Sequence, residues 1–188
     1  MPIGYNEYNR KKIKVWDNDN KKVDLVILDI DGVMTDGTKS YDAEHNVISK
    51  NYCDRDFTAI KRLKDAGVSV CFLSGDARIN EGMAKSRKID FFYSRDKITT
   101  LKEILSKYKV HPANCAYVGD DIFDIPVLEQ VQYSACPSNA PRDVKECCKY
   151  VLSATSGDSV IAEFYDILTR INRVENSFLG MHGRWDNL

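Results

Sequence analysis

The chain has 188 residues, with 27 lysines and arginines against 28 aspartates and glutamates, and 43% of it is hydrophobic. This length suits one domain with its own core, and the balanced composition excludes a wholly disordered chain and a general attraction to nucleic acid or membrane surfaces. No run reaches the about eighteen apolar residues of a membrane span, and the start is too polar for a secretory signal. Because the six cysteines form no C-x-x-C pair, we expect reduced thiols in a cytoplasmic protein.

Apolar runs of strand length alternate with helical patterns along the chain. Strands are expected at 23–30, 68–74, 89–94, 115–120, 133–136 and 150–152. Helices are expected from the apolar spacing that begins at Phe57 and stops at Gly67, and then at 79–88, 99–108, 125–131, 141–148 and 159–173. Near-continuous apolar strands between helices indicate a doubly wound, Rossmann-like α/β fold, in which helices cover both faces of a parallel sheet.

Three segments stand outside this alternation. Residues 38–53 alternate polar and apolar side chains around a polar centre at 43–46, which predicts a β-hairpin that projects from the sheet. Residues 1–22 are expected to be an N-terminal extension, and the polar, glycine-containing residues 175–188 a flexible C-terminal tail. The remainder, 23–174, is expected to be a single domain into which the hairpin is inserted.

Polar side chains follow four of the predicted strands. They are Asp29 and Asp31 after the first strand, Ser74, Gly75 and Asp76 after the second, Lys97 after the third, and Asp120 and Asp121 after the fourth. In a doubly wound sheet, ligands bind beyond the carboxyl ends of the strands. We therefore expect these groups to meet at one rim of the sheet.

Several carboxylates at one rim would repel one another without a cation. Mg²⁺ prefers oxygen ligands and is held by one or two carboxylates, usually together with a substrate phosphate. Lys97, the hydroxyl of Ser74 and the backbone N–H groups near Ser74 and Gly32 would bind a phosphoryl group. One carboxylate can then attack phosphorus, and a second, two residues on and on the same side of an extended segment, can transfer protons. The pattern favours Mg²⁺-dependent phosphoryl transfer.

Four segments, in the expected order, resemble the four motifs of the haloacid dehalogenase superfamily of phosphatases. They are Asp29-Ile-Asp31-Gly-Val-Met-Thr35-Asp36-Gly37, Leu73-Ser74-Gly75, Lys97 and Gly119-Asp120-Asp121-x-x-Asp124. The D-G-V-x-T-D-G form, the AYVGDD strand and the later SGDSVIAEF stretch are most similar to the 3-deoxy-D-manno-octulosonate 8-phosphate phosphatase family and to the related sialic-acid-type 9-phosphate phosphatases. The resemblance covers roughly residues 23–172.

The resemblance implies roles for individual residues. Asp29 would be the nucleophile that forms an aspartyl phosphate, and Asp31 the general acid and base. The resemblance also implies a set of binding residues: Mg²⁺ at Asp29, the main-chain carbonyl of Asp31 and Asp120, with Asp121 and Asp124 in support, and the phosphoryl group at Ser74, Gly75, Gly32 and Lys97.

The substrate implied is a 2-keto-3-deoxy sugar-acid phosphate of eight or nine carbons. Octulosonate phosphatases usually carry arginine after the glycine of the second motif. This chain has Asp76 there, with Arg78 two places on, and the nine-carbon phosphatases resemble it better at that position. We take Asp76 and Arg78 as candidate substrate-binding residues and leave the length of the sugar open.

The chain has no room for the cap domain that closes over the site in many superfamily members. Only the hairpin and one helix separate Gly37 from Ser74, and only a helix and a short strand separate Gly75 from Lys97. In the resembling family a neighbouring subunit of a tetramer covers the site. We therefore expect a homotetramer that the hairpin helps to build.

Other interpretations stay open at this point. A domain of the same fold can serve assembly alone, although loss of Asp29 or Asp31 would mark that fate and both are present. A receiver-type signalling domain also places aspartates on a doubly wound sheet, but its phosphorylated aspartate follows the third strand. The substrate can also be another small phosphorylated metabolite. Finally, Asp121 and Asp124 fit helix capping as well as a role in support of the metal.

Overall fold

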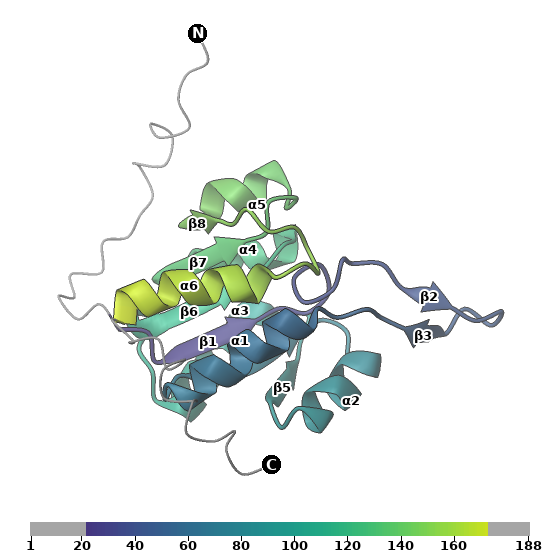
Figure 1. Ribbon diagram of the computed structural model, residues 1–188, viewed down its shortest axis with the longest axis horizontal. Helices are drawn as coiled ribbons and strands as arrows, with labels where there is room; N and C mark the ends of the chain where they lie inside the picture. The colour runs from purple at the N-terminus through teal and green to yellow at the C-terminus, as the bar shows by residue number, and fades with distance from the viewer. Residues whose placement is uncertain (1–21, 173–188) are drawn as a thin grey trace, which may run out of the picture.

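Six parallel strands form one sheet in the computed structural model, which describes residues 22–172 (Figure 1). The strand order is β5-β4-β1-β6-β7-β8. The bounds are β1 Leu25–Leu28, β4 Ser69–Ser74, β5 Asp90–Tyr93, β6 Cys115–Val118, β7 Tyr133–Cys136 and β8 Tyr150–Val151. The chain runs from β1 to one edge and then returns to build the other side, so the strand order reverses beside β1. This confirms the predicted doubly wound sheet.

Helices cover both faces of the sheet (Figure 1). Their bounds are α1 Asp54–Asp65, α2 Arg78–Ser86, α3 Lys97–Tyr108, α4 Ile125–Leu128, α5 Arg142–Cys147 and α6 Val160–Asn172, with 3-10 turns at Pro112–Asn114 and Ile122–Asp124. Side chains alternate along β1, so Val26 and Leu28 join the core under α1, α2 and α6, whereas Leu25 and Ile27 join the core under α3, α4 and α5. Both faces of the central strand are therefore buried.

The ends of the elements differ from the prediction in places. α4 ends at Leu128 and not at residue 131, because the N–H of Gln130 bonds the carbonyl of Val127 and tightens the last turn ahead of β7. β1 ends at Leu28, so Asp29 and Asp31 follow the strand directly. The predicted N-terminal extension and C-terminal tail lie almost wholly outside the described residues, and the division into segments stays a prediction.

A two-stranded hairpin projects from the sheet, as predicted (Figure 1). It pairs β2, Ser40–Tyr41, with β3, Val47–Ser49, in antiparallel register. Only this hairpin and α1 lie between β1 and β4, and no cap domain is present within residues 22–172. In the same range no helix is long and apolar enough to cross a membrane.

Candidate active site

The carboxyl ends of β1 and β6 bring three aspartates together. One carboxylate oxygen from each of Asp29, Asp120 and Asp124 lies within 4.8 Å of the others. Asp29 is only 5% exposed and Asp124 is fully buried. These residues and Lys97 form what we call the strand-tip cluster. The expected meeting of the first, third and fourth motifs at one rim is thus observed.

Lys97 lies between two of these carboxylates. It is the first residue of α3, whose N-cap Asp96 accepts the N–H of Thr99. Its Nζ is 2.9 Å from Oδ1 of Asp29 and 2.6 Å from Oδ1 of Asp124. Burial acts to lower the pKa of Lys97, but the two carboxylates outweigh it and raise that pKa above its ordinary value. Lys97 is therefore a fixed positive charge in the cluster.

Asp124 is hydrogen-bonded on both oxygens. Besides Lys97, Oδ1 accepts the hydroxyl of Tyr117, and Oδ2 accepts the backbone N–H groups of Asp120 and Asp121 at 3.0 and 3.1 Å. Asp121 in turn accepts the N–H of Ile122 at 2.6 Å. The sequence left capping and support of the metal open for both residues. Both side chains cap the 3-10 turn at Ile122–Asp124 by accepting backbone N–H groups at its start. Asp124 also contacts Lys97 and so belongs to the strand-tip cluster.

One carboxylate oxygen of Asp120 lacks a hydrogen-bond partner among the described residues. Its Oδ1 is buried and has no hydrogen-bond partner within residues 22–172. Burial, followed by the charges of Asp29 and Asp124, raises the pKa of Asp120 to about 8. Burial also raises the pKa of Asp29 to about 7, with Lys97 opposing the shift and Asp124 adding to it. Three carboxylates against one ammonium, with an orphaned oxygen, fit a hard divalent cation such as Mg²⁺.

Two glycines allow this close approach. Gly32 has φ +87°, and a Cβ there would overlap the carboxylate of Asp120. A Cβ at Gly119 would lie 2.6 Å from the side chain of Asp124. The N–H of Gly32, a predicted phosphate donor, points to the hydroxyl of Thr35 at 3.4 Å. Both glycines are therefore required by the geometry of the carboxylates.

Asp31 has a different set of partners from Asp29. Oδ1 of Asp31 lies 2.6 Å from Nζ of Lys50, and Oδ2 accepts the side-chain amide of Asn80 at 2.9 Å. Lys50 follows β3 of the hairpin, and Asn80 lies in α2. The repulsion between the two neighbouring aspartates is thus offset by a separate lysine for each. We call Asp31, Lys39, Lys50, Ser74, Asp76, Arg78 and Asn80 the hairpin-base cluster.

Asp76 is surrounded by cations. Arg78 donates from Nε and Nη2 at 2.7 Å each, Lys39 Nζ lies at 2.9 Å and Lys50 Nζ at 3.2 Å. Hydrogen bonding from Arg78, and then the two lysines, hold the pKa of Asp76 well below its usual range. The oxygen of Asp36 accepts from Thr38 in an exposed turn, apart from both clusters.

Ser74, at the end of β4, is hydrogen-bonded to Asp76 and to Asn80. Its hydroxyl accepts the N–H of Asp76 at 3.1 Å and the amide of Asn80 at 3.2 Å, and Gly75 follows directly. Lys39, Lys50 and Asn80 were not predicted as site residues, because no sequence motif marks them. The one available signal was that the two lysines stand immediately before and after the hairpin strands.

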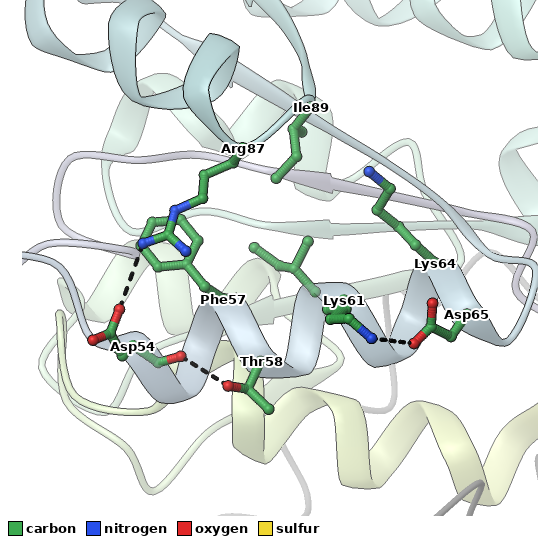
Figure 2. A pocket seen from close by; sticks show the side chains of 9 residues that line it. Asp54, Phe57, Thr58, Lys61, Lys64, Asp65, Arg87 and Ile89 are labelled. Atoms are coloured by element: carbon green, nitrogen blue, oxygen red, sulfur yellow. Dashed lines mark hydrogen bonds and ion pairs between the residues drawn. The ribbon is translucent and has the colours of Figure 1, made fainter. Parts of the chain in front are cut away.

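A separate cavity of about 440 Å³ lies on the flank of α1 (Figure 2). Two ion pairs lie within it, Lys61 with Asp65 at 2.8 Å and Arg87 with Asp54 at 3.5 Å, and Lys64 donates to the carbonyl of Lys88. Exposed pairs of this kind contribute little to stability. Because none of the predicted site residues lines this cavity, it is not the candidate active site.

Comparisons with known proteins find similar sequences and similar folds. A family model described as haloacid dehalogenase-like hydrolase matches residues 91–164. The 3-deoxy-D-manno-octulosonate 8-phosphate phosphatase of Haemophilus influenzae is 33% identical over 151 residues, which are 79% of this chain and 83% of that protein. The cobalt-bound structure of that phosphatase from Haemophilus influenzae has a TM-score of 0.80 at 32% identity and covers 86% of this chain and 95% of its own.

A second solved structure is similar in fold. It is the 3-deoxy-D-manno-octulosonate 8-phosphate phosphatase of Moraxella catarrhalis in complex with a magnesium ion, a phosphate ion and a KDO molecule. It has a TM-score of 0.80 at 21% identity and covers 95% of this chain and 99% of its own. At this identity the likeness concerns the arrangement of the elements.

Proposed function

The chain belongs to the family of 3-deoxy-D-manno-octulosonate 8-phosphate phosphatases, and from this premise we propose a substrate class and a role for each site residue. The chain is a phosphoric monoester hydrolase. Its substrate is the phosphate monoester of a 2-keto-3-deoxy sugar acid, of the octulosonate 8-phosphate or nonulosonate 9-phosphate type. The activity of the relatives supports the eight-carbon substrate, whereas Asp76 after the second motif supports the nine-carbon one.

Hydrolysis proceeds in two displacements. In the first, a carboxylate oxygen of Asp29 forms a bond to phosphorus while the bond between phosphorus and the ester oxygen breaks, and Asp31 gives its proton to that leaving oxygen. In the second, water attacks the aspartyl phosphate, Asp31 takes the proton of the water, and inorganic phosphate leaves Asp29. Lys97, Ser74 and the backbone N–H of Gly75 hold the phosphoryl oxygens throughout, and the N–H of Gly32 turns to them from its long contact with the Thr35 hydroxyl.

Mg²⁺ is the cofactor that the strand-tip cluster fits. The carboxylates of Asp29 and Asp120 and the main-chain carbonyl of Asp31 would hold it, while Asp124 and Asp121 fix the loop that carries Asp120. When bound, Mg²⁺ neutralises charge on the phosphoryl oxygens. The single observation that carries the proposal is the carboxylate of Asp120, which lies in the strand-tip cluster and whose buried Oδ1 has no hydrogen-bond partner among the described residues.

A substrate panel tests the proposal. Sugar-acid phosphates of six to nine carbons are ranked by kcat/KM in the presence of MgCl₂, with Asp29→Asn as the matched control. We expect the eight- or nine-carbon compound to rank first, EDTA to abolish turnover, and Asp29→Asn to lower kcat by about 10⁴-fold or more, because the nucleophile is lost. Undiminished hydrolysis by Asp29→Asn would remove the nucleophile assignment.

Assembly and location are part of the same proposal. Large apolar side chains are exposed on the hairpin, at Tyr41 and Ile48, and beside the site, at Ile122 and Phe123. Clustered exposed apolar residues favour a protein partner, and we take this partner to be a neighbouring copy that covers the site within a homotetramer in the cytoplasm. Light scattering should then give a mass of four chains, and a single-chain mass would contradict it.

A further inference from the structure

The hairpin is attached to the active site through the two residues that bound it. Lys39 immediately precedes β2 and Lys50 immediately follows β3. Both side chains turn inward: Nζ of Lys50 lies 2.6 Å from Asp31, and Nζ of Lys39 lies 2.9 Å from Asp76 and 3.8 Å from Asp31. The base of a projecting element is thus held against the acid that is proposed to transfer protons.

The side chain of Lys50 is too deeply buried to contact the substrate. Its side chain is 0% exposed, whereas that of Asp31 is 22% exposed. A fully buried ammonium is costly unless anions and hydrogen-bond acceptors surround it. Here its acceptors are Asp31, Asp76 and Oδ1 of Asn80, at 2.6, 3.2 and 2.8 Å. Any effect of Lys50 on the reaction must therefore pass through one of these neighbours.

The side-chain amide of Asn80 has a defined orientation. Its oxygen accepts from Lys50 and from the hydroxyl of Tyr52 at 3.2 Å, and its nitrogen donates to Asp31 at 2.9 Å and to Ser74 at 3.2 Å. Asn80 is fully buried. The same amide therefore connects the proposed acid with the hydroxyl proposed to hold the phosphoryl group.

We infer that Lys50 and Asn80 are positioning residues that hold one carboxylate oxygen of Asp31 each and so orient the acid towards the ester oxygen of the substrate. The inference rests on the proposed function, because it requires Asp31 to be the proton donor. Rotation of a carboxylate about its last bond is nearly free in solution, and a proton donor must lie within hydrogen-bond reach of the leaving oxygen. Two donors on opposite oxygens remove that rotation.

The experiment compares two substrates that differ in how much they need an acid. p-Nitrophenyl phosphate releases a weakly basic phenolate, whereas p-nitrobenzyl phosphate, of nearly the same size, releases a strongly basic alkoxide that must be protonated. The measured quantity is kcat/KM, which reports the steps up to the loss of the leaving group. We expect Lys50→Met to lower kcat/KM for the benzyl ester by about 30-fold or more and for the phenyl ester by about fivefold or less.

A second variant and a control complete the test. Asn80→Ala should show the same preference for the phenyl ester, while Lys61→Met, which removes an equal charge from the exposed face of α1, should leave both values unchanged. Thermal unfolding verifies that each variant is folded. Equal losses on the two esters in folded Lys50→Met and Asn80→Ala would overturn the inference and leave the proposed function standing. Failure of the wild-type chain to hydrolyse either ester with Mg²⁺ would instead count against the proposed function.

Discussion

The strand-tip cluster and the hairpin-base cluster meet at the same rim of the sheet but carry opposite charge. In the strand-tip cluster three carboxylates face one ammonium, and an oxygen of Asp120 stays unpaired within the described residues. In the hairpin-base cluster two carboxylates, Asp31 and Asp76, face three cations, Lys39, Lys50 and Arg78. The strand-tip cluster therefore has an excess of negative charge, and the hairpin-base cluster has an excess of positive charge.

The difference in charge corresponds to a division of tasks. A cluster with surplus negative charge attracts a dication, and a cluster with surplus positive charge attracts an anionic substrate. Asp29 and Asp31, which are only two residues apart in the sequence, fall on opposite sides of this division. Two acids of one motif are thus given different surroundings, and environment of this kind separates a nucleophile from a proton donor.

Among changes that leave the proposed nucleophile in place, the largest effect should come from one that removes the hydrogen bonds around Asp124 in the strand-tip cluster. Asp124 accepts four donors on two oxygens, whereas the amide of Asp124→Asn offers one acceptor oxygen. We expect kcat/KM to fall by about 10- to 100-fold, and the free energy of unfolding by about 1–3 kcal/mol, because buried donors lose their acceptor. Steady-state kinetics and urea unfolding measure both. The control is Asp166→Asn on the exposed face of α6, and an equal effect in the two variants would remove the framing role.

An intermediate effect should appear in the pH dependence of stability without metal. The pKa values of Asp29 and Asp120, about 7 and about 8 in the folded state, lie above the 3.8 of an ordinary aspartate. Between these values the folded state binds more protons than the unfolded state, so the free energy of unfolding falls as the pH rises from about 4 to about 8. In EDTA we expect the Tm at about pH 5.5 to exceed that at about pH 8 by several degrees.

Addition of MgCl₂ sharpens that test. The ion binds the ionised carboxylates, so it should raise the Tm more at about pH 8 than at about pH 5.5. Asp120→Asn serves as the matched variant, in which both the pH dependence and the response to Mg²⁺ should shrink. A Tm that rises with pH in EDTA, or that ignores Mg²⁺, would refute the proposed metal site.

The smallest effect should come from the edge of the hairpin-base cluster. The side chain of Arg78 is 55% exposed, and Asp76 keeps Lys39 and Lys50 when Arg78 is removed. We expect Arg78→Gln to raise KM for the sugar-acid phosphate by about fivefold, with kcat unchanged, because solvent screens an exposed charge and leaves it only a small contribution to binding. KM for p-nitrophenyl phosphate, which has no carboxylate, should stay the same. A parallel rise for both substrates would show that Arg78 does not discriminate between them.

Much of the fold follows from local sequence. Strands such as 25–28 and 115–118 consist of apolar runs, because both faces of the parallel sheet are buried, and the pattern is visible without knowing which strands lie beside them. The helix at 125–131 was predicted too long, since its end depends on how the chain turns into β7. The pair Phe91 and Phe92 lies on the edge strand β5 and is only partly buried against the two cores.

Site residues could be predicted from the sequence where they belong to short motifs. Asp29, Lys97 and Asp120 come from short motifs that follow strands, and the structure brings them together. Lys50 and Asn80 lie 19 and 49 residues from Asp31, and neither belongs to a pattern. The contact of Lys50 depends on the direction in which the hairpin leaves the sheet, and that of Asn80 on the placement of α2, and periodicity encodes neither.

The anchoring of the hairpin by Lys39 and Lys50 has an evolutionary consequence. Insertions or deletions at the far turn, residues 42–46, leave the two anchors in place, so the length of this ribbon can drift among descendants without disturbing chemistry. Changes at Lys39 and Lys50, in contrast, should be under the same selection as Asp31, which these lysines contact. Related sequences should therefore vary in length at the turn, residues 42–46, and keep the two lysines at the base of the hairpin.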